Sequence, residues 1–166
     1  TIASSTIGNI VHDSLELIYK DYVGKELKIA DLEKMKGQIN TTVQNAIKKY
    51  VREENVYKGK NIIIVETVKK YVKKVIDLDK KTIEEENQLK IIAIEKEFET
   101  EIVGSEKKYK IRGKIDRIDE LNSELRIIDY KTGKKLNKRN IIIKEKEELK
   151  KEKGIYNLQL LIYMLG

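Results

Sequence analysis

The hydrophobic period of this chain changes near Gln88, and the change predicts a fold that passes from helices to strands. Before Gln88, apolar residues recur three or four positions apart, which is the period of a helix that buries one face. We expect helices at about residues 4–22, 30–54 and 61–78. After Gln88, apolar residues alternate with polar ones or run together, which is typical of strands. We expect strands at about residues 89–103, 109–118 and 125–131, and a last helix at 154–164.

Short turns separate the predicted strands, at about residues 104–107 and 119–124. Because short turns join antiparallel neighbours, the strands should form an antiparallel meander. We therefore predict an α/β fold of the α+β kind, with an N-terminal group of three helices, a three-stranded meander and a following helix. The chain of 166 residues is long enough for a single domain, helical at about 1–86 and built of strands and the last helix at about 88–166. We expect this domain to be a piece of a longer chain.

The composition excludes several classes of protein. The absence of cysteine excludes disulfides, thiolate zinc sites and iron–sulfur clusters within this sequence. Apolar runs are far shorter than a membrane span, and the first residues do not form a signal peptide, so we expect a cytoplasmic protein with no membrane partner. The net charge of +7 favours a polyanionic partner such as nucleic acid. A lysine-rich surface that contacts only water would give the same net charge.

Asp129 and Lys131 lie two residues apart at the end of the third predicted strand, directly after two isoleucines. Residues two apart on a strand point to the same face. A carboxylate and an ammonium are costly to bury among apolar side chains unless they pair or bind a metal. Asp116 lies on the preceding strand, and if the two strands pair as a hairpin, Asp116 and Asp129 can converge on one cation. The alternative is a set of ordinary ion pairs at strand ends.

Three other residues of the second strand have structural explanations. Gly113 leaves room for the close approach of a backbone or a ligand. Asp119 lies three residues after Asp116, so on a straight strand it faces away from Asp116. We therefore assign Asp119 and Arg117 to structure or local pairing.

The remaining polar candidates each allow a structural as well as a functional interpretation. His12 is the only histidine and lies beside the apolar stripe of the first helix, where Glu16 or a main-chain carbonyl could form a hydrogen bond with it. Glu97 alternates with other glutamates on the first strand, and most of these must be solvated. Tyr156, Gln159 and Tyr163 share one face of the last helix, which is also ordinary for an amphipathic helix.

The order of these segments carries a resemblance to a known family. The matching segments are Ile7–Glu16, the strand around Glu97, Gly113–Asp119, Ile128–Lys134 and Tyr156–Tyr163. This set resembles the RecB-type branch of the PD-(D/E)XK nuclease superfamily, and within it the C-terminal nuclease domain of AddB-like helicase–nuclease subunits. The resemblance covers nearly the whole chain and implies a restriction-endonuclease-like core.

The resemblance also implies roles for the matching residues. Lys131 would be the lysine of the catalytic motif, acting with Asp116 and Asp129. The implied ligands of a Mg²⁺ or Mn²⁺ ion are His12, Asp116, Asp129 and the main-chain carbonyl of Tyr130. The implied supporting or DNA-binding residues are Glu97, Lys134, Tyr156, Gln159 and Tyr163. Many AddB-like relatives carry four cysteines for an iron–sulfur cluster, and this chain departs from them because it has none.

The function implied is that of a metal-dependent DNA nuclease. We expect an exonuclease that processes DNA double-strand breaks in recombinational repair, within a helicase–nuclease that includes a UvrD-type helicase partner. The lysine-rich segment that begins at Lys134 would contact DNA phosphates. The chain has no Gly-x-x-x-x-Gly-Lys phosphate loop, so it would not itself bind ATP in that way. The alternative is a catalytically inactive nucleic-acid-binding or scaffold domain of a helicase complex.

Overall fold

The computed structural model describes residues 4–103 and 108–131. Contacts divide these residues into two compact units, one of residues 4–95 and 116–131, the other of residues 96–103 and 108–115. The expected turn at 104–107 and the expected last helix lie outside the described residues. So do four of the predicted site residues, Lys134, Tyr156, Gln159 and Tyr163.

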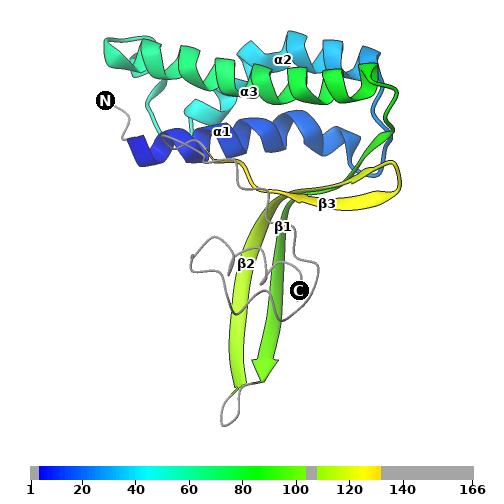
Figure 1. The fold of residues 1–166 in the computed structure, drawn as a ribbon. Helices are drawn as coiled ribbons and strands as arrows, with labels where there is room; N and C mark the ends of the chain where they lie inside the picture. Colours follow the sequence, from blue (N-terminus) through cyan, green and yellow to red (C-terminus); the bar gives the residue numbers. More distant parts are fainter. Residues whose placement is uncertain (1–3, 104–107, 132–166) are drawn as a thin grey trace, which may run out of the picture. The chain divides into compact units, whose positions relative to one another are not determined.

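Helices precede strands along the chain, as the change of period predicts (Figure 1). The elements are α1 (Ser4–Tyr19), η1 (Lys20–Tyr22), α2 (Ile29–Ile47), η2 (Glu53–Asn55), α3 (Lys60–Glu84), β1 (Leu89–Val103), β2 (Lys108–Leu121) and β3 (Glu124–Ile128). The strands form one sheet in the order β1–β2–β3. β3 runs antiparallel to β2, with Arg117 opposite Ile128. The predicted α/β fold is confirmed for the described residues.

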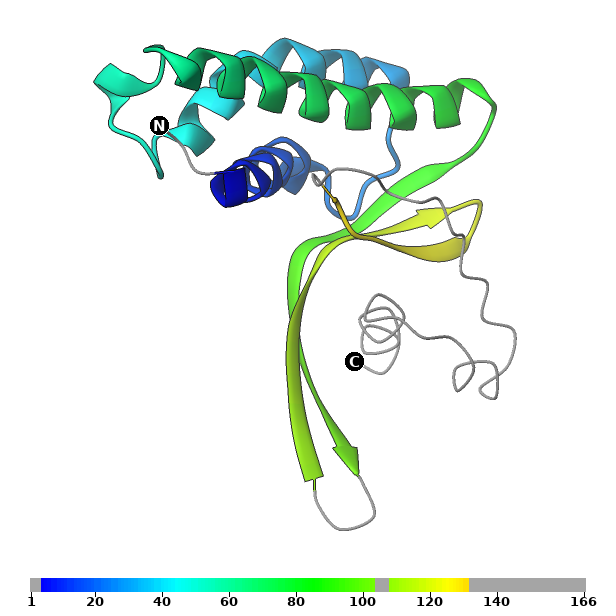
Figure 2. The same cartoon turned by 60° about the vertical axis from the view of Figure 1, so that its left-hand side comes forward.

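The core of the first unit lies among the three α-helices and the start of β1. α1 packs against both other helices, and Figures 1 and 2 show it between the α2–α3 pair and the strands of this unit. Apolar side chains that the helical period predicts to be inward are almost completely buried. Examples from the three helices are Val11, Leu15, Ile39, Val43, Val68 and Val72. Among the described residues, no helix combines the length and apolar character that a membrane span requires.

The loop between η1 and α2 covers one edge of β1. The amide of Gly24 donates to the carbonyl of Ile91 at 2.7 Å, and the amide of Leu27 donates to the carbonyl of Leu89 at 2.8 Å. Gly24 has a φ of +81°, a conformation that glycine adopts at little cost. This pairing satisfies main-chain groups that an edge strand would otherwise leave open, and it fixes the start of β1 against the helices.

The second helix ends earlier than predicted. α2 stops at Ile47 instead of continuing to about residue 54, and its last turn tightens, with the amide of Tyr50 donating to the carbonyl of Ile47 at 2.9 Å. Tyr50, which shares the helical spacing of the buried Val43 and Ile47, is 39% exposed. Its hydroxyl donates to Asp13 of α1 at 3.0 Å, so this tyrosine makes a surface contact between helices instead of joining the core.

The third helix runs longer than predicted, to Glu84 instead of about Leu78. The apolar stripe is interrupted at Asp79, one residue after the predicted end. Asp79 nevertheless occupies an inward position and is only 7% exposed. Its carboxylate can be buried there because it accepts hydrogen bonds from the Tyr19 hydroxyl at 2.6 Å and from the Arg117 guanidinium at 2.6 and 3.2 Å.

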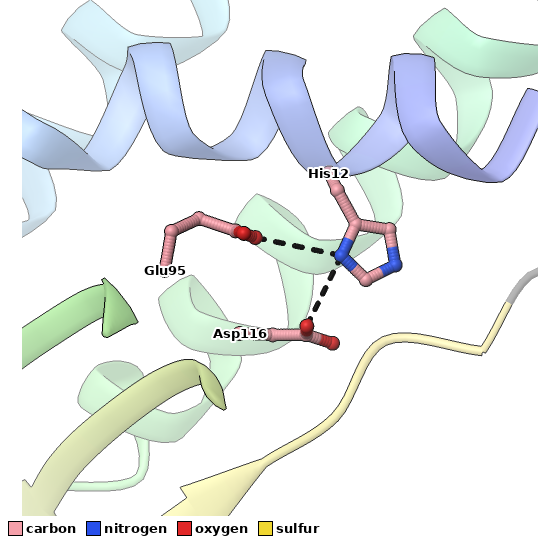
Figure 3. Close-up of side chains that lie close together, drawn as sticks. All are labelled: His12, Glu95 and Asp116. Carbon is pink, nitrogen blue, oxygen red and sulfur yellow. Dashed lines mark ion pairs between the residues drawn. The ribbon is translucent and has the colours of Figure 1, made fainter. Parts of the chain in front are cut away.

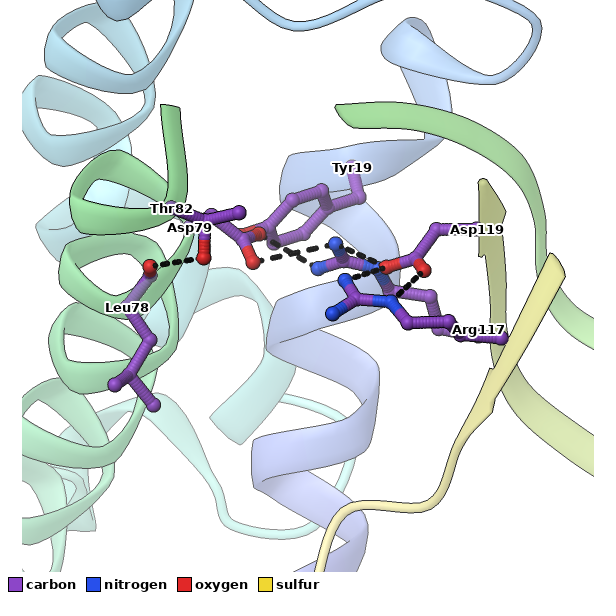
Figure 4. Close-up of polar contacts among 7 residues, drawn as sticks. Tyr19, Leu78, Asp79, Thr82, Arg117 and Asp119 are labelled. Atoms are coloured by element: carbon purple, nitrogen blue, oxygen red, sulfur yellow. Dashed lines mark hydrogen bonds and ion pairs between the residues drawn. The ribbon is translucent and has the colours of Figure 1, made fainter. Parts of the chain in front are cut away.

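Asp79 belongs to a buried polar cluster that joins the helices to the sheet (Figure 4). We define the Arg117 cluster as Tyr19, Asp79, Arg117, Asp119 and Arg126. Arg117 also contacts Asp119 at 2.6 Å, and Asp119 accepts hydrogen bonds from Arg126 at 2.8 and 3.1 Å. The expected local pairing of Arg117 with Asp119 is confirmed. The cluster contains two anions and two cations, so its formal charge is balanced.

The second unit contains a close approach at Gly113, but the approaching group is a side chain and not the backbone or ligand that was expected. The approaching group is the ring of Phe98, since a Cβ atom built on Gly113 would lie 2.5 Å from both Cε1 and Cζ of that ring. Both residues belong to this unit. A side chain at this position would therefore require the Phe98 ring to move.

Gly113→Ala is expected to destabilise the protein by about 1–3 kcal/mol, because the new methyl group must displace the Phe98 ring. Chemical denaturation of the wild type and the variant measures the change. Phe98→Leu in the Gly113→Ala background should recover part of the loss, since the smaller side chain leaves room for the methyl group. Wild-type stability in Gly113→Ala would contradict the packing described here.

Candidate metal centre

Three side chains of the first unit converge at the point where α1 meets the sheet (Figure 3). Nδ1 of His12 lies 3.1 Å from Oδ1 of Asp116 on β2 and 3.4 Å from Oε1 of Glu95 on β1. Each residue offers one ligand atom, and the three atoms lie within 4.8 Å of one another. An imidazole and two carboxylates at this spacing form the kind of donor set that holds a divalent cation.

The position of His12 on α1 determines which groups its ring contacts. Val11 and Leu15 point into the helical core, and His12 lies beside that stripe with about a quarter of its side chain exposed. Of the partners expected for the ring, a main-chain carbonyl is present, but the carboxylates are those of Asp116 and Glu95 in place of the expected Glu16. Nδ1 faces the two acids, and Nε2 lies 3.0 Å from the main-chain carbonyl oxygen of Tyr130.

Glu95, which the sequence analysis did not select, is the acid of β1 in this group. Its φ is +51°, in the left-handed region that non-glycine residues rarely adopt. This conformation interrupts the extended geometry of β1, so the rule of alternating faces does not predict where its side chain points. Backbone conformations of this kind are more frequent at functional sites. Glu97, for which the resemblance implies a supporting or DNA-binding role, is exposed and belongs to the second unit, and that role stays a prediction.

The main chain of Tyr130 connects two members of the group. Its amide donates to Oδ2 of Asp116 at 2.5 Å, while its carbonyl oxygen faces His12. The rings of His12 and Tyr130 meet edge to face, with their centroids 6.1 Å apart. The hydrogen bond to Asp116 also explains why β3 ends at Ile128, before the predicted end at Lys131, because the Tyr130 amide binds a side chain instead of the neighbouring strand.

Asp129 and Lys131 form an ion pair directly after β3. The ammonium of Lys131 lies 2.8 Å from Oδ1 and 2.6 Å from Oδ2 of Asp129. Asp129 and Lys131 therefore contact each other, as predicted for two residues on one face of a strand. They lie, however, after the last residue of β3. Asp129 is not a member of the group formed by His12, Glu95 and Asp116, so its predicted role as a ligand stays a prediction.

The two carboxylates make His12 a strong base. Hydrogen bonds to Asp116 and then to Glu95 raise the pKa of His12 from 6.5 to about 10, although burial opposes the charged form. At neutral pH and without a metal, the ring is therefore an imidazolium that donates from both nitrogens. Its positive charge partly offsets the negative charge of the two acids.

Without metal, the contribution of His12 to stability should decline as the pH rises. The pKa of His12 is higher in the folded chain than in the unfolded chain, so the charged form stabilises the fold fully below about pH 6.5. That contribution is lost as the pH rises through about 10. Unfolding in EDTA, compared between the wild type and His12→Gln at several pH values, should show a stability difference that shrinks between these limits. A constant difference would contradict the assignment.

The comparisons with known proteins identify the family. The model of the PD-(D/E)XK nuclease superfamily matches residues 1–166, and the chain belongs to this superfamily. Members are generally nucleases that use divalent metals, and the fold described above is consistent with a restriction-endonuclease-like core. No curated protein matches the chain, and no solved structure does.

The donor set fits the metal that the family uses. His12, Glu95 and Asp116 supply one imidazole nitrogen and carboxylate oxygens, and hard oxygen ligands of this kind suit Mg²⁺ or Mn²⁺. The Tyr130 carbonyl oxygen, which the resemblance implies as a further ligand, lies at the other nitrogen of the His12 ring. The chain has no cysteine, so it holds no iron–sulfur cluster.

Proposed function

We propose that the protein is a deoxyribonuclease that depends on Mg²⁺ or Mn²⁺. The observation that carries the proposal is the convergence of His12, Glu95 and Asp116 in a chain of the PD-(D/E)XK superfamily. These three residues would hold the metal. Asp129 would complete the site, and so would the Tyr130 carbonyl if it leaves Nε2 of His12, where it lies in the structure. A bound divalent ion polarises the scissile phosphate and lowers the pKa of an attacking water.

The protein side chains would orient the reactants and offset charge. The side chain of Lys131 is 36% exposed and pairs with Asp129, so its ammonium lies at the surface. The resemblance implies that Asp129 is a metal ligand, which would place this ammonium beside the metal. From there it would orient the attacking water or offset the negative charge that develops on the phosphate. Asp116 would hold the metal while accepting the Tyr130 amide, which keeps its carboxylate in one orientation.

The narrower assignment is to the RecB-type branch, with AddB-like nuclease domains as the nearest resemblance. Under this proposal the protein is an exonuclease in the processing of DNA double-strand breaks, and it works with a UvrD-type helicase. The order of the motifs in the sequence supports it, and the net charge of +7 supports DNA as the partner. Glu97, Lys134, Tyr156, Gln159 and Tyr163 would then contact DNA or support the site.

Digestion of linear and circular DNA tests the proposed function. The chain is incubated with each substrate in Mg²⁺, Mn²⁺ or EDTA, beside Asp129→Ala and Lys131→Ala. We expect cleavage that requires metal and is lost in both variants, with linear DNA preferred if the enzyme needs ends. DNA binding that does not lead to cleavage in either metal would favour the inactive nucleic-acid-binding domain.

Glu95 and Glu97 offer a matched comparison, because both are glutamates of β1 and lie two residues apart. Glu95→Gln is expected to weaken Mn²⁺ binding about 10-fold or more, since it removes one of the two acids beside His12. Glu97→Gln should have the smaller effect. A titration with Mn²⁺, in which the electron paramagnetic resonance signal of the free ion is recorded, measures the Mn²⁺ dissociation constant of each variant. The reverse order would show that Glu97, and not Glu95, is the acid of β1 that binds the metal.

A further inference from the structure

The segment that joins α2 to α3 carries an excess of exposed positive charge. We call residues 48–60 the basic connector. Its sequence contains two acids and five cations, and the cations are all exposed: Lys48, Lys49, Arg52, Lys58 and Lys60. Along α3, by contrast, several lysines pair with acids three or four residues away. A local excess of cations attracts a polyanion.

Exposed apolar side chains gather on the basic connector and on the first turn of α3. Among the described residues, seven large hydrophobic side chains are exposed, and four of them lie in this short stretch: Tyr50, Tyr57, Ile62 and Ile63. Tyr57 is 47% exposed, and its hydroxyl accepts a hydrogen bond from the side chain of Gln44 on α2. Exposed aromatic rings among cations are the combination that binds single-stranded nucleic acid, because phosphates pair with the cations and bases stack on the rings.

The main chain of the basic connector is fixed by contacts with the helices. Val56 is 3% exposed and belongs to the helical core. The buried side chain of Asn61 donates to the carbonyl of Asn55 at 2.9 Å, and the amide of Asn55 donates to the carbonyl of Arg52 at 2.9 Å. Because these contacts order the segment before a ligand binds, binding loses little conformational entropy of the main chain.

The basic connector lies beside the part of α1 that carries His12. Asp13, the next residue of α1, pairs with Lys49 at 3.1 Å and accepts a hydrogen bond from the Tyr50 hydroxyl at 3.0 Å. Figures 1 and 2 show the connector at the end of the helical layer where α1 begins. Successive residues of a helix are about 100° apart around its axis. A strand with one phosphate at the candidate metal centre therefore has to pass around only one side of α1 to reach the connector.

We propose that the basic connector binds single-stranded DNA next to the candidate metal centre. Arg52, Lys58 and Lys60 pair with phosphates, and the ring of Tyr57 stacks on a base. Bases inside a duplex are already stacked on their neighbours, so an exposed ring favours an unpaired strand. This inference rests on the proposed function, because it supplies a binding surface for the DNA that the metal centre cleaves.

The first test removes charge from the basic connector. Arg52→Gln combined with Lys58→Gln is compared with Lys70→Gln combined with Lys74→Gln, which removes the same charge from exposed positions of α3. Lys70 lies roughly 15 Å along the helix axis from Lys60, beyond the screening length of about 10 Å at 0.1 M salt. The affinity for a fluorescently labelled oligothymidylate is measured by anisotropy at several salt concentrations. EDTA is present throughout, so that metal-dependent cleavage does not occur.

We expect the connector pair of changes to weaken binding about 10-fold. The slope of log K against log salt should fall by about 0.7 for each phosphate contact that is lost. The α3 pair should change the affinity less than about twofold. Equal losses in the two pairs would overturn the inference, because net charge alone would then explain the binding. Wild-type affinity in the connector pair would overturn it as well.

The second test removes the ring and keeps the charge. Tyr57→Leu retains an apolar side chain and should weaken binding of the oligothymidylate about fivefold or more, with the salt slope of the wild type. Tyr57→Phe keeps the ring and loses only the hydrogen bond with Gln44, so its affinity should stay within about twofold of the wild type. An equal effect of the two changes would overturn the stacking role of Tyr57. An equal loss of duplex binding in Tyr57→Leu would overturn the assignment to single strands.

The two proposals fail in different ways. A chain that cleaves DNA with Mg²⁺ or Mn²⁺, beside connector variants that bind the oligothymidylate as the wild type does, would overturn the role of the connector alone. A chain that binds through the connector in EDTA but cleaves DNA with neither metal would overturn the nuclease. The connector would then be the binding surface of the inactive nucleic-acid-binding domain.

Discussion

Asp116→Asn is expected to lower metal-dependent cleavage by on the order of 10²–10⁴-fold, the range found when an enzyme loses an electrostatic or acid–base group. Asp116 is 8% exposed and uses both oxygens, one toward His12 and one toward the Tyr130 amide. Asparagine keeps the shape, but it removes a negative charge that the cation needs and must turn an NH₂ group toward one of these two donors. Initial rates in saturating Mg²⁺ or Mn²⁺ measure the effect.

Asp13→Asn is the matched control for the loss of one carboxylate near His12. Asp13 follows His12 on α1, but it pairs with Lys49 at 3.1 Å and accepts from the Tyr50 hydroxyl, so it is not a member of the group formed by His12, Glu95 and Asp116. Its replacement should leave the rate within about threefold of the wild type, because a surface ion pair contributes little. Equal losses in the two variants would mean that Asp116 acts through overall charge and not as a ligand.

Asp79→Asn is expected to have the largest effect on stability, lowering the free energy of unfolding by about 3–5 kcal/mol. The carboxylate is buried and accepts hydrogen bonds from Tyr19 and Arg117, so its removal leaves a buried guanidinium with Asp119 as its remaining acid in the cluster. For a chain of this size, such a loss corresponds to a fall in melting temperature of roughly 6–20 °C. Thermal and chemical unfolding should agree on the direction and size of this change in the free energy of unfolding.

Asp77→Asn provides the comparison on the same helix. Asp77 lies two residues before Asp79 and pairs with Lys36 and Lys73, but its side chain is 40% exposed. Because exposed ion pairs contribute at most about 1 kcal/mol, this change should cost far less. A loss in Asp79→Asn as small as that in Asp77→Asn would show that the Arg117 cluster does not hold the helices to the sheet.

Apolar periodicity was enough to predict the order of the elements. Helical spacing indicated α1, α2 and α3, and alternation after Gln88 indicated the strands, because burial of one face imposes those periods. The predicted ends of α2 and α3 are wrong where a polar residue occupies an inward position or a tyrosine points outward. Asp79 is buried because partners distant in sequence satisfy it, and Tyr50 is exposed because its hydroxyl binds Asp13.

Part of the candidate centre could be predicted and part could not. His12 and Asp116 were selected from the sequence and its resemblance, and the structure brings them together. Glu95 was not selected because its side chain depends on a left-handed backbone conformation, which alternation along a strand does not predict. The main-chain contacts of Tyr130 with Asp116 and His12 could not be predicted from alternation either, because they lie beyond the end of β3 and connect residues far apart in the chain.

The measurement that tests the central claim most directly is the anomalous scattering of Mn²⁺ in a crystal of this chain. The predicted result is a peak within roughly 2.4 Å of a carboxylate oxygen of Asp116 and a ring nitrogen of His12, with Glu95 beside it. Because the imidazole and the acids now contact one another, binding should also separate Nδ1 of His12 from Asp116 beyond 3.1 Å. A chain that cleaves DNA with Mn²⁺ bound elsewhere, or with none at this position, would contradict the assignment.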